Sequence, residues 1–476
     1  MKTRYSLVLI VVALAMSALM PSCKKDPKDP EPKKSTYVQN WIYDNMKYWY
    51  YWSDQMPANP DTTLEPEEFF YSLLYNGPEG DRFSWIEPNY TTLINELNGV
   101  NKDAGYDFRL YLKESGSSDI IGQITYIKKG SPAETEGLLR GDIFSAINGT
   151  TITTANYREL LGATSKSYTV RIQRYNSNSQ TPYYDKVHTL NPVEFSENPL
   201  LMDSVYTFTD KKVGYMVYNF FSPGVGSSKT YDQQVDNVFA DFKSKGVNEV
   251  VLDLRFNGGG AISSAINLAS LLVPAYDPTK IFVNYQYNNE VQSDIINDPR
   301  YGSAYLHQKF VSKASNIGSN LTRLFVLTSN GTASASELII NGLRPYMDVI
   351  TIGDTTYGKN VGSITITDDQ NTTNTWGMQP IVMKLTNSLG FSDYSKGFAP
   401  KPENFDADNY FVLKPLGDIQ EPLLYKALYI ITNGNMTKSA RPSAIISGNQ
   451  VKGANRQLNQ FKTNMYLSPE MTPLRR

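Results

Sequence analysis

The chain has 476 residues, of which 40% are hydrophobic and 19% are charged. This length and composition predict several folded domains and exclude a disordered chain or a long coiled coil. Lys and Arg number 45 against 47 Asp and Glu, so the charge balance gives no reason to expect a nucleic-acid partner. A single Cys excludes a disulfide framework and a Cys-based zinc site. Only two His are present, which leaves little material for a His-dependent triad, and we expect no metal or cofactor.

Residues 1–22 predict an export signal, because two basic residues precede an uncharged apolar run over residues 6–20. That run is too short to span a bilayer comfortably. Cys23 follows directly, in an arrangement that resembles a bacterial lipoprotein signal; an ordinary cleaved signal with an incidental Cys is the alternative. Residues 23–34 alternate charge with proline and predict a solvated tether. We therefore expect an exported cell-envelope protein, lipid-anchored at the periplasmic or outer-membrane surface.

Residues 35–100 predict a small N-terminal helical domain. Aromatic residues are dense over residues 37–52 at helix-compatible spacing, and a second helix is predicted to begin near Glu65-Pro66. An aromatic stripe of this kind is more often core than a ligand site, so we expect no chemistry from this domain.

Residues 101–195 predict short strands. The run from 120 to 152 contains a strand, a Gly-Ser-Pro turn, a short helix and a strand that ends at Asn148-Gly149, a strong hairpin signal. This order resembles a PDZ domain, which binds peptide C-termini by strand addition. The resemblance places the carboxylate-binding loop at Gly105, Tyr106, Asp107 and Phe108, where the charge of Asp107 would oppose an anionic terminus.

Residues 196–435 alternate strands and helices, which predicts an α/β arrangement with sites at the strand ends. A buried strand over residues 248–256 runs into three glycines, and a helix follows through residue 272. The remaining residues, 436–476, form a polar and irregular C-terminal extension to which we assign no function.

Three features of this region could carry chemistry. Gly258–Gly260 lie where a strand meets a helix N-terminus, so their N–H groups could face an anion, although a tight turn is the commoner reason for such glycines. Ser334 lies in a small-residue turn where a helix begins, although an N-cap role is commoner. Lys359 follows an apolar strand, and burial of a lysine lowers its pKa toward the range of a general base.

Taken in order, the DLRFNGGG run, the TASASE run around Ser334 and the Gly-Lys pair at Lys359 resemble the carboxyl-terminal processing peptidases, which are tail-specific serine proteases with a PDZ domain. The resemblance covers roughly residues 105–430. The aromatic N-terminal helices also resemble those of Bacteroidetes-type lipoprotein members. The family implies a multidomain α/β fold: a small helical domain, a PDZ-like β domain and a protease core related to the ClpP/crotonase-type β/α spiral.

The resemblance also implies residue roles. Ser334 matches the nucleophile and Lys359 the general base, while the backbone N–H groups of Gly259 and Ala335 match the oxyanion hole. The family usually has Gln or Glu four residues after the Lys to orient its amine, and Ser363 occupies that position here. Three further motif positions are expected to be architectural: Asp253, Arg255 and Glu337.

From these matches we expect a Ser-Lys serine endopeptidase that cleaves unfolded proteins or proteins presented through their C-terminal tails. Its expected partners are polypeptides and, through the lipid anchor, a membrane. The sequence leaves the oligomeric state open. Two alternatives are a catalytically weak, PDZ-containing peptide-binding lipoprotein and an apolar small-molecule binder on the same core.

Overall fold

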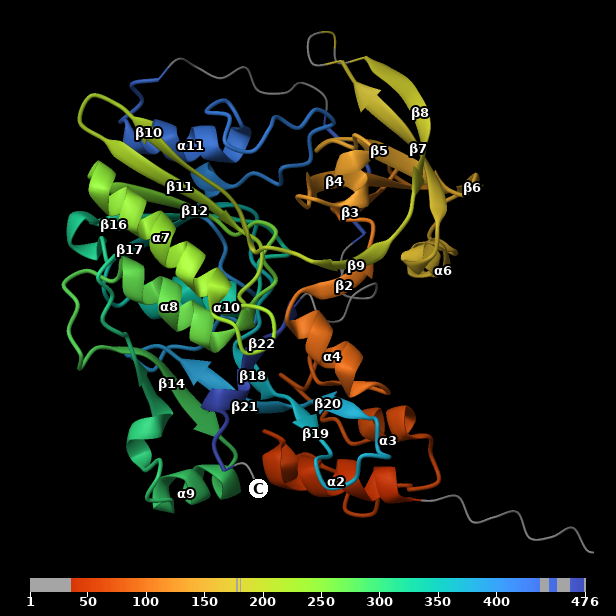
Figure 1. Ribbon diagram of the computed structural model, residues 1–476, viewed down its shortest axis with the longest axis vertical. Helices are drawn as coiled ribbons and strands as arrows, with labels where there is room; N and C mark the ends of the chain where they lie inside the picture. Colours follow the sequence, from red (N-terminus) through yellow and green to blue (C-terminus); the bar gives the residue numbers. More distant parts are fainter. Residues whose placement is uncertain (1–35, 177–178, 180, 437–444, 452–462, 475–476) are drawn as a thin grey trace, which may run out of the picture.

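A computed structural model describes residues 36–176, 179, 181–436, 445–451 and 463–474 (Figure 1). The predicted signal, the tether and Cys23 lie outside the described residues. Within the described ranges, no helix combines the length and the apolar character needed to cross a membrane.

The N-terminal segment is helical, as predicted. In the first helix, Ile42, Met46 and Trp49 recur at helical spacing and are buried, and they join the same hydrophobic core as the helices of the α/β region. The aromatic segment is therefore core. The helices of this segment are α2 (Tyr37–Trp49), α3 (Pro66–Ser72) and α4 (Tyr90–Leu97), with a 3-10 turn at Ser53–Gln55.

The PDZ-like region is an antiparallel sheet in the order β3-β4-β5-β7-β8, with β6 paired to β5. Asn148 (φ 50°) and Gly149 (φ 78°) form the predicted tight turn between β5 and β6. A two-stranded ribbon, β2 (Val100–Asp103) with β9 (Val193–Ser196), flanks the sheet. The sheet comprises β3 (Tyr106–Leu112), β4 (Ile120–Ile127), β5 (Ile143–Ile147), β6 (Thr150–Thr151), β7 (Tyr168–Tyr175) and β8 (Pro182–Leu190), with helices α5 (Pro132–Thr135) and α6 (Tyr157–Gly162).

A five-stranded sheet, β10-β11-β12-β16-β17, forms the centre of the α/β region; β10 is antiparallel and the others are parallel. Side chains of β12 alternate between its two faces: Val250 and Leu252 pack with α7, α8 and α10, while Val251 packs with α11. Figure 1 shows helices on both faces of this sheet. The elements are β10 (Leu200–Thr207), β11 (Lys212–Tyr218), β12 (Glu249–Asp253), β16 (Arg323–Thr328), β17 (Asp348–Gly353), α7 (Thr230–Lys245), α8 (Ile262–Leu272), α10 (Ala335–Leu343) and α11 (Pro422–Ile431).

A second sheet runs β13-β22-β18-β21-β14-β15, and a small sheet runs β1-β20-β19. Strand β22 (Met465–Leu467) belongs to the C-terminal extension, to which no function was assigned. It nevertheless lies inside the sheet, between β13 (Gly260–Ala261) and β18 (Val361–Ile364). The other elements are β1 (Trp85–Glu87), β14 (Ile281–Tyr287), α9 (Asn289–Asn297), β15 (His307–Lys309), β19 (Ile366–Thr367), β20 (Gly377–Gln379) and β21 (Ile381–Thr386).

Candidate active site

Ser334 immediately precedes helix α10 and has φ 64° and ψ −118°. A residue other than glycine is strained in this region, and such strain is typical of functional turns. The side chain is fully buried. The small residues around it allow this turn to pack closely: Ala333 donates its N–H to the carbonyl oxygen of Asn257 in the glycine-rich loop. Ser334 is therefore held in a tight strand-to-helix turn directly against that loop.

Glu337 links the predicted nucleophile to the predicted base. One carboxylate oxygen accepts hydrogen bonds from the backbone N–H groups of Ser334 (2.8 Å) and Lys359 (2.8 Å). The other accepts from the Thr356 hydroxyl (2.6 Å) and the Gly358 N–H (2.7 Å). Burial raises the pKa of Glu337 to about 7, and these hydrogen bonds oppose the rise. The position expected to be architectural therefore fixes both residues of the predicted dyad.

Lys359 is fully buried. Its Nζ donates to the backbone carbonyl oxygen of Thr463 at 2.9 Å and lies 4.9 Å from the centroid of the Phe83 ring. The amine is thus held between the N-terminal segment and the C-terminal extension. Sequence patterns missed both contacts, because a backbone carbonyl and a common aromatic ring carry no catalytic signature.

The predicted oxyanion-hole residues lie on either side of Ser334. Gly259 has φ 116°, and a Cβ there would lie 2.6 Å from Ser334 Cβ and 2.3 Å from the carbonyl oxygen of Asn464, so only glycine fits. Its N–H donates to Asn257 Oδ1 at 2.9 Å. Ala335 is the first residue of α10, where an N–H has no partner within the helix. Their role in binding an oxyanion remains a prediction.

Ser363 lies on β18 and is buried. Its hydroxyl donates to the Met465 carbonyl oxygen (3.0 Å) and accepts from Gln379 Nε2 (3.1 Å). The hydroxyl therefore anchors β22 in this conformation, and its predicted role in orienting Lys359 remains a prediction. Gln379 was missed because it lies on a separate strand, β20, whose position depends on long-range pairing.

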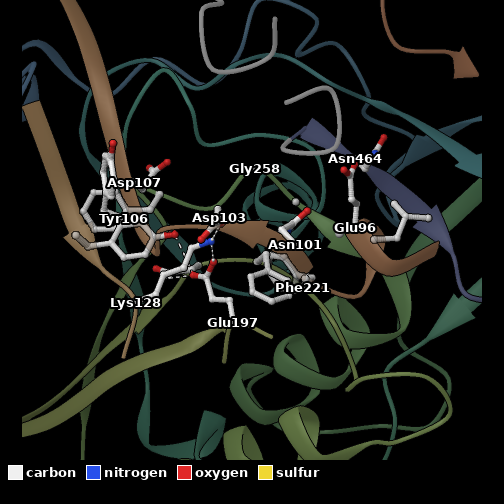
Figure 2. A pocket seen from close by; sticks show the side chains of 18 of the residues that line it. Glu96, Asn101, Asp103, Tyr106, Asp107, Lys128, Glu197, Phe221, Gly258 and Asn464 are labelled. Atoms are coloured by element: carbon white, nitrogen blue, oxygen red, sulfur yellow. Dashed lines mark hydrogen bonds and ion pairs between the residues drawn. The ribbon is translucent and has the colours of Figure 1, made fainter. Parts of the chain in front are cut away.

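The residues predicted to form the carboxylate-binding loop, 105–108 (here called the PDZ loop), are largely strand, because β3 begins at Tyr106 and only Gly105 precedes it. They face the same space as the glycine-rich loop, residues 257–260. A cavity of about 230 Å³ is lined by Tyr106, Asp107 and Phe108 together with Gly258–Gly260. Figure 2 shows Tyr106, Asp107 and Gly258 around it. Gly105, at φ 86°, packs against Ser131. The predicted tail-binding residues and the predicted oxyanion-hole residue Gly259 thus line one cavity, while Ser334 and Lys359 are buried behind its wall.

The wall of this cavity is rich in carboxylates. Lys128, the only Lys or Arg among the described residues that line it, forms ion pairs with Asp103 (2.7 Å) and Glu197 (3.1 Å). Burial raises the pKa of Glu96, another lining residue, to about 8. Asp107 is buried and accepts a hydrogen bond from the Thr125 hydroxyl (3.2 Å). The cavity therefore offers a peptide carboxylate no uncompensated positive side chain.

No group of three or more His, Cys, Asp or Glu side chains in the described part of the chain is placed to hold a metal ion.

Three family profiles match the chain in the predicted order. The peptidase S41 N-terminal domain matches residues 37–85, the PDZ domain matches residues 123–174, and peptidase family S41 matches residues 212–383. The predicted multidomain α/β organisation, with an N-terminal domain, a PDZ domain and a protease-type core, is confirmed.

Two curated relatives and one solved structure show the extent of the similarity. A carboxyl-terminal-processing protease of Picosynechococcus is 28% identical over 59% of this chain, and the carboxy-terminal processing protease CtpA of Bacillus subtilis is 25% identical over 48%. The matched regions span 62% and 43% of the lengths of those relatives. A crystal structure of a protein from Bacteroides fragilis described as an S41 protease is 28% identical, with a TM-score of 0.66, covering 86% of this chain and 99% of that one.

Proposed function

The chain belongs to peptidase family S41, and from this premise we propose that it is a serine endopeptidase with Ser334 as the nucleophile and Lys359 as the general base. The observation that carries the proposal is the Glu337 carboxylate, which binds the backbone N–H groups of both residues at 2.8 Å. A buried acid that fixes a strained serine and a buried lysine together is an arrangement for positioning two reacting groups.

In the proposed reaction, the neutral amine of Lys359 accepts the hydroxyl proton of Ser334 as Oγ bonds to the substrate carbonyl carbon. The developing oxyanion is bound by the N–H groups of Ala335 and Gly259, the latter after it leaves Asn257 Oδ1. The Lys359 ammonium then protonates the leaving nitrogen, the C–N bond breaks, and an acyl ester remains on Ser334. Water that gives its proton to Lys359 hydrolyses this ester and restores the free serine.

The proposed substrates are unfolded polypeptides or proteins presented through their C-terminal tails. The supporting observation is the shared cavity, because Tyr106 and Phe108 of the PDZ loop line it together with Gly258–Gly260. A tail bound by strand addition at the PDZ loop would therefore lie next to the reaction centre.

Export and a lipid anchor at Cys23 belong to the same proposal and are supported by the sequence of residues 1–34. A Cys23→Ser variant is expected to move from the membrane fraction to the soluble fraction after cell lysis while it still cleaves casein. Fractionation followed by immunoblotting measures this. A variant that stays with the membrane would show that the anchor is not Cys23.

Cleavage of casein, an unfolded protein, tests the proposed dyad. Ser334→Ala and Lys359→Ala are expected to lower the rate about a thousandfold or more, because each removes a reacting group. The wild-type rate is expected to rise with pH, because only the neutral amine accepts a proton. Ser244→Ala and Lys245→Ala, which change exposed side chains of α7, serve as matched controls. Retained cleavage in Ser334→Ala would refute the proposal, and a wild type that binds peptides without cleaving them would favour the peptide-binding alternative.

A further inference from the structure

The glycine-rich strand β13 has neighbours on both sides. On one side it is bonded to Phe221, which receives a hydrogen bond from the Ala261 N–H and donates its own N–H to the Gly259 carbonyl. On the other side it pairs in parallel with β22, in the register Gly260 to Met465 and Ala261 to Tyr466. Strand β22 also pairs with β18. No strand of another polypeptide can pair with β13 while β22 is in place.

The residues just before β22 lie directly on the catalytic residues. The Thr463 carbonyl oxygen accepts the hydrogen bond from Lys359 Nζ at 2.9 Å. The Asn464 carbonyl oxygen accepts from the Gly260 N–H at 2.5 Å. Both Ser334 and Lys359 are fully buried under this arrangement. Because Ser334 is buried, a substrate carbonyl can reach it only if a segment that covers it moves away. Residues 463–467 are an extended segment that lies against the site.

These contacts are those that an extended substrate makes by strand addition: main-chain hydrogen bonds to the glycine-rich strand and a carbonyl oxygen beside the nucleophile. We propose that residues 463–467 act as a built-in occupant of the substrate-strand position, so that the enzyme rests in a self-inhibited state until a substrate displaces them. The inference rests on the proposed function and adds its regulation. The Asn464 carbonyl oxygen accepts from the N–H of Gly260, whereas the predicted oxyanion donor is the N–H of the preceding residue, Gly259. The segment is therefore bound, but its carbonyl carbon is not positioned for attack by Ser334.

Strand β22 is held by its neighbours on both sides and by its own side chains, since Met465 and Leu467 are buried in the main hydrophobic core. A substrate strand must therefore replace these contacts with its own in order to displace β22. Tyr466 provides a main side-chain anchor: it packs with Trp85 and Leu93, and its hydroxyl donates to the Leu97 carbonyl oxygen at 3.0 Å. Asn464 Nδ2 is buried with no hydrogen-bond partner among the described residues, which is a cost of the closed state.

The same cavity connects β22 to the PDZ loop. Asn464 and Tyr466 line it together with Tyr106 and Phe108, and Figure 2 shows Asn464 across the cavity from the PDZ residues. A tail that enters along the PDZ loop therefore meets β22 at its own binding position. Tail binding and release of β22 are thereby coupled by competition for one space.

A disulfide lock tests the proposal in the full chain. In a Cys23→Ser background, Ala261→Cys with Tyr466→Cys places two thiols on paired positions of neighbouring strands, within the separation that a disulfide spans. The reduced protein is expected to cleave casein, the oxidised protein to lose at least about tenfold of that rate, and a reductant to restore it. The Cys23→Ser protein, oxidised in the same way, is the control. Equal cleavage by the oxidised and reduced forms would overturn the proposal.

A variant that weakens the closed state is expected to change the rate of casein cleavage in the opposite direction, and this test does not require the disulfide. Tyr466→Ala removes one side-chain anchor of β22 and is expected to raise casein cleavage roughly fivefold or more, since the closed state loses the packing of a buried aromatic ring as well as one hydrogen bond. Tyr466→Phe removes only the hydrogen bond to Leu97 and is expected to give a smaller rise. If β22 is instead permanent scaffold, both variants lose cleavage in step with their melting temperatures, and the proposal is wrong.

If the proposed protease function itself is wrong, the variants are expected to give a different set of cleavage results. In that case the wild type, the reduced lock and both Tyr466 variants are all inert toward casein, and no variant forms an acyl-enzyme on Ser334. A different result would refute only the self-inhibition: the wild type cleaves casein, Tyr466→Ala cleaves it more slowly than the wild type, and the oxidised lock cleaves it as fast as the reduced lock. The proposed Ser334–Lys359 dyad would then be retained.

Discussion

At the scale of single residues, Glu337 controls the geometry of the site. Its carboxylate has four donors within 2.8 Å, two of them the N–H groups of Ser334 and Lys359. The ionised form matches four donors, because a protonated carboxyl would turn one acceptor position into a donor. We therefore expect cleavage to need the ionised form and to decline below about pH 7, where burial has placed the pKa of this group.

The raised pKa of Glu337 has a measurable effect on stability. A rise from the ordinary value of 4.5 to about 7 is worth roughly 3 kcal/mol. The folded protein holds the proton more tightly than the unfolded chain, so this stability is fully present below pH 4.5 and is lost as pH rises through 7. The melting temperature of the wild type, relative to that of Glu337→Gln, is therefore expected to fall between pH 5 and pH 8. A difference that stays constant over this range would contradict the raised pKa.

The Glu337→Gln variant also separates positioning from stability. The amide nitrogen would face two N–H or O–H donors, so we expect about tenfold slower cleavage at pH 8 even where the variant is fully folded. Because the variant cannot ionise, its rate should show no decline attributable to this position near pH 7.

At the scale of secondary-structure elements, the sequence predicted those whose pattern is local. The apolar run before the glycines became β12, the helix through Leu272 became α8, and the small-residue turn at Ser334 became the start of α10. Each has a strong periodic or apolar pattern of its own. The candidate catalytic residues were instead predicted from the resemblance of three runs, in order, to those of the carboxyl-terminal processing peptidases.

Strand β22 could not be predicted in this way. It has three residues, Met465–Leu467, in a polar stretch, and its place in the sheet depends on pairing with Gly260 and Ser363, which are far away in the sequence. Short strands fixed by long-range pairing carry little local signal. The contact of Thr463 with Lys359 was missed for the same physical reason, because a backbone carbonyl can belong to any residue type.

At the scale of the whole molecule, a buried charge cluster joins the PDZ domain to the core. Arg255, fully buried, pairs with Asp253, Asp408 and Glu421. Arg140 of the PDZ domain reaches the same cluster, 3.5 Å from Glu421, and donates to the Lys414 carbonyl oxygen at 3.0 Å. Burial works to raise the pKa of Asp408, but the neighbouring arginines hold it below its ordinary value. The positions expected to be architectural thus set the place of the PDZ domain beside the site.

Removing one of the two PDZ arginines that reach this cluster, Arg140 and Arg109, should loosen the domain. Arg140→Met leaves buried carboxylates with less compensation, and we expect it to cost about 3 kcal/mol at the interface and to increase the radius of gyration measured by small-angle scattering. Lys186→Met, which removes an exposed ion pair with Glu136, is the control and should change neither quantity. An unchanged radius and melting temperature in Arg140→Met would show that the contacts of Arg140 do not hold the PDZ domain.

The identity of the nucleophile is tested most directly by trapping the acyl-enzyme. A peptide ester whose acyl group is hydrolysed slowly is mixed with the wild type, the reaction is quenched in acid, and the modified residue is located by mass spectrometry of the digested protein. We predict one acyl group on Ser334 of the wild type, none in Ser334→Ala, and strongly reduced acylation in Lys359→Ala. Acylation of a different residue, or cleavage by the wild type that is unaffected by Ser334→Ala, would contradict it.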